Sequence, residues 1–536
     1  MNGANMIAEI LKLEGVEFIS CFPNSSLINS AHQAGIRTVL ARQERVAVNI
    51  ADGYSRTSNG TKIGACTMQE TVGLENSFSA IAQAFSDSVP ILLLPCQLNR
   101  RRLGVNPIFA DDLHACKTVT KWIDCVNFAD RIPEMMRRAF TYLRTGRRGP
   151  VILEVPTDVA AEECGERSKY NRVTGWRTSA DPVDVERVAR ALSTAKNPIL
   201  HVGQGIFYAQ AWEELREFAE LTQIPVMTTI AGKSAFPENH PLSLGYGGYT
   251  ATKAVNHFLT KADLVFSIGS SLTTWWLTAP IPSGKIIIQS TVDDYDINKD
   301  YPVDYALIGD AKLVLRQLIN EIKRTTNSRV QKNELVDNIA RIKREWIEEW
   351  IPKLTSNEIP INPLRVIWDL MKAIDRKNTI VTHDAGYPRD HLAPFYESLV
   401  PRGYLGWGNR TTLGYSLGGS IGAKLAEPKK AVINIMGDAA IGMTGMDLET
   451  AAREKIPILT IVLHNSVMTG YSRITPSTHK LSGDYAKFAE AMGGYSEVIE
   501  QPDEIIPSIK RALASDRIAL LDVITKEETS LPQYWT

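Results

Sequence analysis

Two residues with the chemistry of metal ligands follow apolar runs near the C-terminal end of this 536-residue chain. The apolar run 431–436 is followed by Gly437 and Asp438, and the apolar run 456–463 is followed by His464 and Asn465. These runs, separated by a helical pattern, predict two buried parallel strands joined by a helix. Since the carboxyl ends of parallel strands share one sheet edge, Asp438 and Asn465 are expected there together. Mg²⁺ prefers such oxygen ligands and often shares them with a phosphate.

The segment between the two strands is expected to be helical. Thr444 and Asp447 have the spacing of a capping box, in which side chains satisfy the first backbone N–H groups of a helix. Judged on this segment alone, Gly-Asp and His-Asn have a second interpretation, in which they only mark the ends of strands. Other segments of the chain are needed to decide whether these residues only end strands or form a ligand site.

Composition places the chain among globular proteins of several domains. At ~150 residues per domain, 536 residues correspond to about three domains. The hydrophobic content of 44% and the charged content of 22% are ordinary for globular proteins. A net charge of −1 and a pI of about 6.8 provide no electrostatic footprint for nucleic acid or an anionic membrane. No apolar run approaches the ~18 residues that span a bilayer, so we expect a soluble cytoplasmic protein.

The cysteines carry no sign of a disulfide framework or a zinc site. None of the six has a C-x-x-C neighbour, and several lie in apolar runs. We therefore expect buried thiols in a reducing compartment. The residues are Cys21, Cys66, Cys96, Cys116, Cys125 and Cys164.

Strand and helix patterns alternate through most of the chain, which predicts an α/β fold with three doubly wound parallel-sheet domains. We expect an N-terminal domain at 1–165, a central domain at 183–330 and a C-terminal domain at 355–536. A polar linker at about 164–182 separates the first two, and a charged helix at about 331–350 precedes the third.

Two distant segments together resemble one enzyme family. The segment from Gly437-Asp438-Ala439 to His464-Asn465 resembles the Gly-Asp-Gly to Asn-Asn signature of thiamine diphosphate enzymes, with Ala439 and His464 as departures. The stretch QERVAVNIADGYSR, residues 43–56, resembles the HE-x-x-A-x-x-x-A-x-GYAR segment of the same family. The resemblance implies a pyrimidine-binding, a middle and a diphosphate-binding domain, in that order.

The resemblance also implies roles for individual residues. Asp438, Asn465 and the carbonyl of Val467 would bind Mg²⁺, and the Glu44 carboxyl would hydrogen-bond N1′ of the aminopyrimidine ring. That contact favours the tautomer whose N4′ atom takes the proton from C2 of the cofactor, so Glu44 would be the catalytic residue. Leu413 would wedge the two thiamine rings into a bent form.

Further cofactor contacts follow from matching the remaining segments to the family. They would come from the strand ends and helix N-termini that border the diphosphate, from backbone groups near the pyrimidine and from the N-terminal domain. The expected residues are Asn76, Ala385, Gly386, Tyr387, Pro388, Thr411, Gly437, Ala439, Ala440 and Met468.

The branch that the chain resembles most is the acetolactate synthase large subunit. This implies that a small 2-oxo acid loses CO₂ on the cofactor and that the remaining fragment is transferred or released. It also implies a homodimer or homotetramer, because the family places the glutamate and the metal motif on different subunits. Two alternatives stay open: a lyase or decarboxylase for 2-hydroxyacyl- or oxalyl-type CoA thioesters, and a non-catalytic cofactor-binding paralogue.

Several expected pocket positions depart from that branch. Pro23-Asn24-Ser25 replaces Pro-Gly-Gly, Ile474 stands where a tryptophan shapes the acceptor pocket, and Pro107-Ile108 replaces Phe-Gln. Asn24, Ser25, Gln69 and His114 are polar residues that could face the pocket. FAD-binding relatives carry Arg-Phe-Asp-Asp-Arg where residues 271–275 read Ser-Leu-Thr-Thr-Trp, so we lean against FAD.

Overall fold

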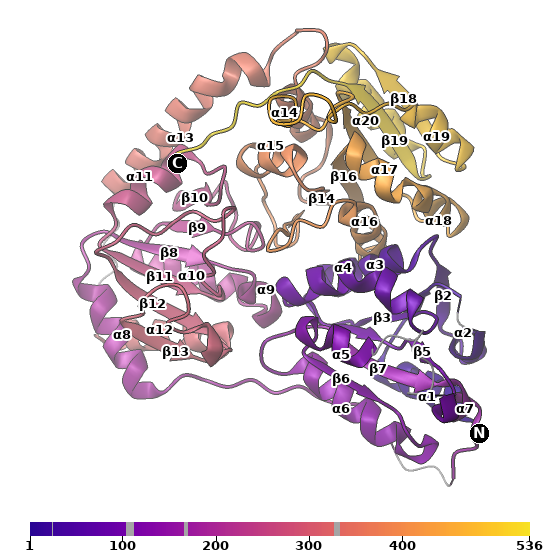
Figure 1. Cartoon of the computed structure of the whole chain (residues 1–536). Helices are drawn as coiled ribbons and strands as arrows, with labels where there is room; N and C mark the ends of the chain where they lie inside the picture. The colour runs from indigo at the N-terminus through magenta and orange to yellow at the C-terminus, as the bar shows by residue number, and fades with distance from the viewer. Residues whose placement is uncertain (24, 103–111, 166–169, 326–332, 536) are drawn as a thin grey trace.

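The computed structural model describes residues 1–23, 25–102, 112–165, 170–325 and 333–535. Three α/β domains meet around the centre of the molecule, and the C-terminal segment runs back to the middle domain beside α11 (Lys253–Lys261) and α13 (Asn333–Leu354) (Figure 1). Every strand pairing in the three sheets is parallel among the described residues, as the alternating pattern predicts.

The N-terminal domain is built on a sheet of order β2-β1-β3-β4-β7-β5, with β6 paired to β7. Helices cover both faces, and each face has its own apolar core. The strands are β1 (Phe18–Cys21), β2 (Arg37–Leu40), β3 (Gly64–Thr67), β4 (Ile91–Leu93), β5 (Cys96–Gln97), β6 (Trp122–Cys125) and β7 (Val151–Pro156). The helices are α1 (Gly3–Glu14), α2 (Ser25–Gln33), α3 (Glu44–Thr57), α4 (Val72–Ser86), α5 (Asp112–Cys116), α6 (Ile132–Arg144) and α7 (Thr157–Ala161).

The middle domain has the sheet order β10-β9-β8-β11-β12-β13. The chain reverses direction across the sheet between β8 and β11, which is where open α/β sheets form a crevice. Its strands are β8 (Pro198–Val202), β9 (Val226–Thr228), β10 (Ser243–Tyr246), β11 (Leu264–Ile268), β12 (Ile286–Thr291) and β13 (Tyr305–Ile308). Besides α11 and α13, it has α8 (Pro182–Thr194), α9 (Gly205–Ala209), α10 (Trp212–Thr222) and α12 (Ala311–Thr325).

The C-terminal domain has the sheet order β15-β14-β16-β17-β19-β18. Strand β16 therefore lies in the interior of the sheet, between β14 and β17. The strands are β14 (Thr379–His383), β15 (Tyr404–Leu405), β16 (Ala431–Gly437), β17 (Leu459–His464), β18 (Tyr495–Ile499) and β19 (Ala519–Ile524). The helices are α14 (Pro363–Ala373), α15 (Tyr387–Phe395), α16 (Tyr415–Ala426), α17 (Asp438–Thr444), α18 (Leu448–Arg453), α19 (Tyr485–Ala491) and α20 (Ile505–Ala514).

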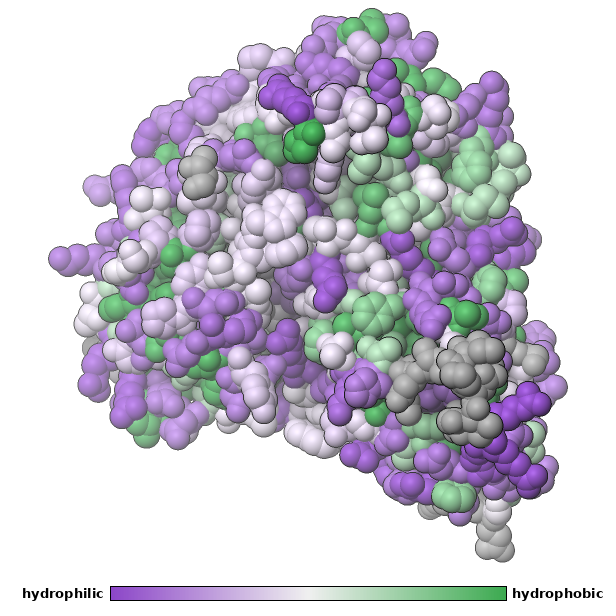
Figure 2. All heavy atoms as spheres, viewed as in Figure 1, coloured by the Kyte–Doolittle hydropathy of each residue, from purple (hydrophilic) through white to green (hydrophobic). Residues whose placement is uncertain are grey.

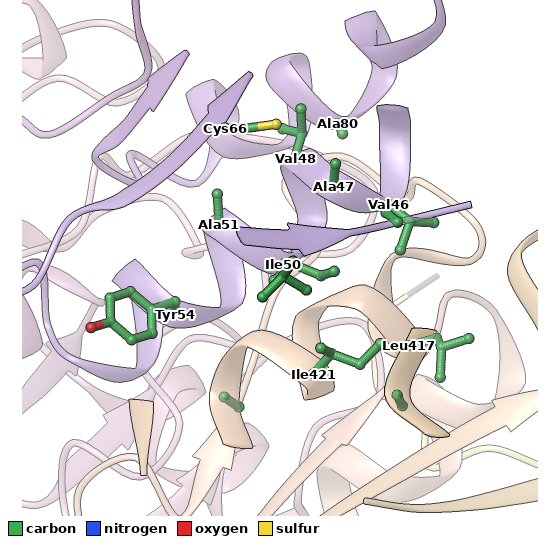
Figure 3. Packing of buried hydrophobic residues seen from close by; sticks show 14 of the residues in the cluster. Val46, Ala47, Val48, Ile50, Ala51, Tyr54, Cys66, Ala80, Leu417 and Ile421 are labelled. Carbon is green, nitrogen blue, oxygen red and sulfur yellow. The ribbon is translucent and has the colours of Figure 1, made fainter. Parts of the chain in front are cut away.

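Helices α3 and α16 join the first and third domains through very close packing. Figure 3 shows Val46 and Ile50 of α3 beside Leu417 and Ile421 of α16. A Cβ atom at Gly422 would lie 2.1 Å from the carbonyl oxygen of Ile50. The small residues of α16 therefore allow the two backbones to approach, and this contact fixes how α3 meets the C-terminal domain.

A buried ion network lies along the same contact. Arg56 is fully buried and pairs with Asp52 (Nε–Oδ1, 2.8 Å) and Asp87 (Nη1–Oδ2, 3.0 Å). The Tyr415 hydroxyl on α16 donates to Asp52 Oδ1 at 2.6 Å. Removing one member of such a network leaves a buried charge without its partner, so these residues hold the domain contact together.

The expected capping box at Thr444 and Asp447 is wrong. Helix α17 already begins at Asp438, Thr444 is its last residue, and a short 3₁₀ turn (Gly445–Asp447) separates it from α18. The Thr444 hydroxyl donates to the Gly414 carbonyl at 3.1 Å, and Asp447 Oδ1 accepts the Arg42 N–H at 2.8 Å. Both side chains serve tertiary contacts, which spacing along the sequence does not reveal.

The viewed surface of the molecule is mostly hydrophilic, and hydrophobic residues form separate small groups on it (Figure 2). None of the six cysteines, all of which lie within the described residues, forms a disulfide bond. Among the described residues, no helix has the length and apolar character needed to cross a membrane.

Candidate functional site

The candidate site is a hollow of about 650 Å³ at the carboxyl edge of the C-terminal sheet. Strand β16 pairs in parallel with β17, with Gly437 opposite Leu463, so Asp438 and Asn465 emerge at one edge. Both line the hollow together with Val467.

The buried Asp438 carboxylate has an oxygen that is available to bind a cation. Its side chain is 4% exposed, and Oδ2 has no hydrogen-bond partner. Burial raises the pKa of this carboxyl. The shift is opposed in part by the Ala439 N–H, which donates to Oδ1 at 3.0 Å, by nearby His464 and by the backbone N–H groups of Ser466 and Asn465. A buried carboxylate oxygen without a partner is costly, and a bound cation would remove that cost.

The loop after β17 presents the other two oxygen donors. Asn465 Oδ1 accepts the Val467 N–H at 3.1 Å, and its Nδ2 donates to Thr469 Oγ1 at 2.6 Å. These contacts orient the amide while its oxygen keeps a second lone pair for a ligand. Between them, Ser466 takes a left-handed conformation with φ 58°, which turns the chain sharply after the strand.

No described residues form a group of three or more His, Cys, Asp and Glu side chains able to hold a metal ion. A set of one carboxylate, one amide oxygen and one carbonyl is of the kind that Mg²⁺ uses when a phosphate supplies further oxygens. The donors that line the hollow therefore fit Mg²⁺ better than a soft metal such as zinc.

The start of helix α15 forms another part of the lining. Ala385, Gly386, Tyr387 and Pro388 line the hollow. Gly386 has φ 79°, and a Cβ atom there would meet nothing within 4 Å. This is a positive-φ turn that opens a nine-residue helix toward the hollow, where the helix N-terminus favours an anion such as a diphosphate.

Leu413 is the apolar side chain at the entrance to α16. It is half-buried, lines the hollow and packs against Ala385, Trp407 and Tyr415. Below it, both oxygens of Asp384 accept hydrogen bonds from the start of α16, including Ser416 Oγ at 2.6 Å and the Gly414 N–H at 2.8 Å. This buried carboxylate holds the chain turn that presents Leu413.

The structure brings most of the expected cofactor residues to this hollow. Those that line it are Ala385, Gly386, Tyr387, Pro388, Leu413, Gly437, Asp438, Ala439, Ala440, Asn465, Val467 and Met468. Thr411 does not line it. Glu44 and Asn76 lie elsewhere, in the N-terminal domain, where Asn76 Nδ2 donates to Glu44 Oε2 at 3.4 Å.

Glu44 is the first residue of α3 and is 3% exposed. Its neighbours contact the C-terminal domain: the Arg45 guanidinium donates to the Leu413 carbonyl, and Gln43 Nε2 donates to the Met443 carbonyl at 3.3 Å. The Glu44 side chain itself does not line the hollow of its own chain.

Several residues of the hollow escaped the sequence analysis. His391 lies one turn into α15, Tyr471 lies on the loop after β17, and Thr525 and Glu528 follow β19. The last two follow the end of the final strand, so the same topological rule that found Asp438 would have pointed to them. Pro363, Leu463 and Thr469 complete the lining.

The expected substrate-pocket positions are only partly described. Asn24, Pro107 and Ile108 lie outside the described residues, as does the side chain of Ser25. Ile474 is 73% exposed on the loop after β17. Gln69 is half-buried and His114 exposed, and neither lines the hollow.

A second hollow, of about 1,300 Å³, lies in the middle domain at the crevice between β8 and β11. Gly203, Gly269, Arg147, Asp296 and Asp310 are among its lining residues. Arg147 contacts Asp293 at 3.2 Å and Asp296 at 3.1 Å, whereas Arg148, which also lines the hollow, donates to the Leu143 carbonyl at 2.9 Å. This hollow has the position of a nucleotide site.

Comparison with known proteins covers all three domains. Three family models of thiamine pyrophosphate enzymes match the chain. They are the N-terminal TPP binding domain at residues 1–119, the central domain at 185–318 and the C-terminal TPP binding domain at 384–523.

Curated relatives match over nearly the full length. A probable acetolactate synthase large subunit of Methanococcus aeolicus is 32% identical over 99% of this chain and 93% of its own length. The acetolactate synthase large subunit of Haemophilus influenzae is 28% identical over 98% of this chain and 95% of its own. The isozyme 3 large subunit of Escherichia coli is 27% identical, with 98% and 94% coverage.

These matches, together with a sheet edge that presents a carboxylate, an amide and a helix N-terminus to one hollow, lead to one conclusion: the chain belongs to the thiamine pyrophosphate-dependent enzymes.

Proposed function

We propose that the protein is a thiamine diphosphate-dependent carboligase that decarboxylates a small 2-oxo acid, with pyruvate as the first candidate, and joins the remaining fragment to a second carbonyl. Support comes from the full-length similarity to acetolactate synthase large subunits. The observation that carries the proposal is the Asp438 Oδ2 atom, which has no hydrogen-bond partner, in a hollow that Asn465, Val467 and the start of α15 also line.

Asp438, Asn465 and the Val467 carbonyl would hold Mg²⁺, and the first turn of α15 would orient the diphosphate. Leu413 would separate the two rings of the cofactor. The cofactor supplies a carbon nucleophile and an electron sink for 2-oxo acid chemistry. The apolar lining around Leu413 would exclude water from the reacting carbon.

Glu44 would hold a proton at N1′ of the aminopyrimidine ring and thereby promote removal of the C2 proton. Because Glu44 does not line the hollow of its own chain, we propose that a second copy supplies it. The working unit would then be a homodimer, or a homotetramer made of two such dimers. A reducing cytoplasmic environment remains a prediction.

FAD remains unassigned, and we propose that the middle-domain hollow does not carry it. The segment after β11 is Ser271-Leu272-Thr273, and the Ser271 and Thr273 hydroxyls bond each other at 2.8 Å. None of these three side chains carries a charge for a pyrophosphate.

The test is a screen of purified protein with thiamine diphosphate and Mg²⁺ for CO₂ release from pyruvate, oxaloacetate, glyoxylate, benzoylformate and oxalyl-CoA. Products are identified by mass spectrometry. Acetolactate from pyruvate is the expected result. Turnover of oxalyl-CoA alone would replace the proposal by the CoA thioester alternative, and no turnover of any acid would contradict it.

A further inference from the structure

The loop after β17 carries the Asn465, Val467 and Met468 positions of the candidate site, so whatever holds this loop controls that site. Its N-terminal half is held within the loop itself: the Leu481 N–H donates to the Ser466 carbonyl at 2.8 Å, and the Met468 N–H to the His479 carbonyl at 2.8 Å. These two bonds join the beginning of the loop to its end. They do not fix it relative to the sheet.

The start of the loop is tied to the sheet, because the Ser466 hydroxyl bonds Nε2 of His464, the last residue of β17, at 3.0 Å. The later part of the loop is held by Glu527. This residue lies three residues after the end of β19, and its Oε1 atom accepts two hydrogen bonds from the loop. The Gly470 N–H donates at 2.8 Å, and the Ser472 hydroxyl donates at 3.0 Å. Hydrogen bonds to a carboxylate are about twice as strong as neutral ones, so this pair is a firm attachment.

The attachment point is shaped to receive Tyr387. Gly470 has φ 84°, and a Cβ atom there would lie 3.0 Å from both Cε2 and Oη of Tyr387. The Tyr387 ring, from the first turn of α15, therefore lies directly against the Gly470 backbone. Glu527 and Tyr387 hold the same residue from two sides, one by hydrogen bonds and the other by packing.

Glu527 is itself anchored through its neighbours. Thr525 forms a parallel bridge with Ile361, and Glu528 accepts Lys353 Nζ at 3.0 Å and Asn362 Nδ2 at 3.2 Å. The position of Glu527 is thus defined by α13 and the start of α14. A fixed carboxylate next to the site transmits that rigidity to the loop.

We propose that Glu527 is a positioning residue that clasps the loop 465–472, so that the Val467 carbonyl and the Asn465 amide stand ready for the metal ion. This rests on the proposed function, in which these two groups bind Mg²⁺. Only one oxygen of Glu527 bonds the loop, so a glutamine, whose Oε1 also accepts, keeps both contacts.

Three variants test the clasp by binding. Glu527→Ala removes both hydrogen bonds, Ser472→Ala removes one, and Glu527→Gln retains both. We expect the Mg²⁺ concentration for half-maximal thiamine diphosphate binding, followed by tryptophan fluorescence, to rise about tenfold in Glu527→Ala and about threefold in Ser472→Ala. Glu527→Gln keeps both contacts but loses the charge, so its increase should be clearly smaller than that of Glu527→Ala. The melting temperature without cofactor should change little in all three.

Amide hydrogen exchange without cofactor provides the second readout. The Gly470 amide should be protected in the wild type and in Glu527→Gln, and should exchange much faster in Glu527→Ala. Equal protection in Glu527→Ala would overturn the clasp. Equal impairment of Glu527→Gln and Glu527→Ala would also overturn it, since charge and not the acceptor geometry would then matter.

The two readouts separate this proposal from the proposed function. If the wild type bound no thiamine diphosphate at any Mg²⁺ concentration, the proposed function would fail. The exchange series would still decide whether Glu527 holds the loop.

Discussion

The same tripeptide, Gly-Asp-Ala, joins a strand to a helix in two domains of this protein, with opposite outcomes. Gly309-Asp310-Ala311 follows β13 in the middle domain. In the C-terminal domain, Gly437 is the last residue of β16, and Asp438 and Ala439 begin α17. Each tripeptide lines the hollow of its domain, and burial raises the pKa of each aspartate. The two aspartates thus share their local sequence, and burial shifts the pKa of both in the same direction.

What differs is the use of the carboxylate oxygens. Asp310 Oδ1 caps its own helix by accepting the Lys312 N–H at 3.0 Å and the Leu313 N–H at 3.4 Å, and Oδ2 lies 3.6 Å from Arg177. Asp438 Oδ2 has no partner. Strand β13 is at the edge of its sheet, whereas β16 is flanked by β14 and β17. Beside β16, the loop after β17 brings Asn465 and Val467 to the hollow that Asp438 lines.

The largest expected effect is that of replacing Asp438 by alanine, with the same replacement of Asp310 as the control. Asp438→Ala should abolish Mg²⁺-dependent retention of thiamine diphosphate, because it removes the only charged donor of the three proposed ligands. Asp310→Ala is the matched control and should bind the cofactor normally. Isothermal titration with thiamine diphosphate and Mg²⁺ measures both, and normal affinity in Asp438→Ala would refute the metal site.

Glu44→Gln is expected to separate chemistry from binding. The amide cannot hold the proton at N1′ as a carboxyl does, so C2 deprotonation should slow by about 10²- to 10⁴-fold while cofactor affinity stays close to the wild type. Hydrogen-deuterium exchange at C2 of the bound cofactor, read by NMR, measures this step. An unchanged exchange rate would remove Glu44 from its proposed role.

Acid should destabilise both the C-terminal and the middle domain, because each contains at least one buried histidine whose pKa is lowered. Burial lowers the pKa of His391 to about 4 and of His383 to about 3 in the former, and of His201 to about 4 in the latter. Between pH 6.5 and about 4 the unfolded chain binds protons that the folded state does not, so stability falls as pH falls.

Denaturant unfolding at several pH values, followed by exchange in each domain, measures the slope of that loss. His391→Phe, a replacement of similar size, should reduce the slope below pH 6.5. The same slope in this variant would mean that His391 is protonated in the folded protein.

The smallest expected effect concerns the aspartate that caps a helix. Asp310→Ala should lower the stability of the middle domain by about 0.5 to 2 kcal/mol, as loss of a helix cap does. Asp310→Asn keeps the Oδ1 acceptor and should lose less. Urea unfolding of the two variants gives the comparison, and equal losses would show that Arg177 and not the cap makes the contribution.

Much of the fold followed from patterns along the chain. The alternation of apolar runs and helical segments indicated three parallel α/β domains, because buried parallel strands need crossover helices and consist of nearly continuous apolar residues. The same patterns, read at the strand ends, placed Asp438 and Asn465 at one edge. The capping box at Thr444 and Asp447 failed, because both side chains bond to groups far away in the sequence.

By itself, the sequence determined which residues can bind a metal ion and a diphosphate, because ligand chemistry belongs to side-chain type and strand ends are local features. It did not determine which of two identical Gly-Asp-Ala tripeptides has an oxygen to spare, since Arg177 reaches Asp310 only through the fold. The attachment of the loop by Glu527 and the separation of Glu44 from its own hollow likewise depend on contacts between distant segments. Those were decided by the tertiary structure, in which strand order sets the neighbours of every side chain.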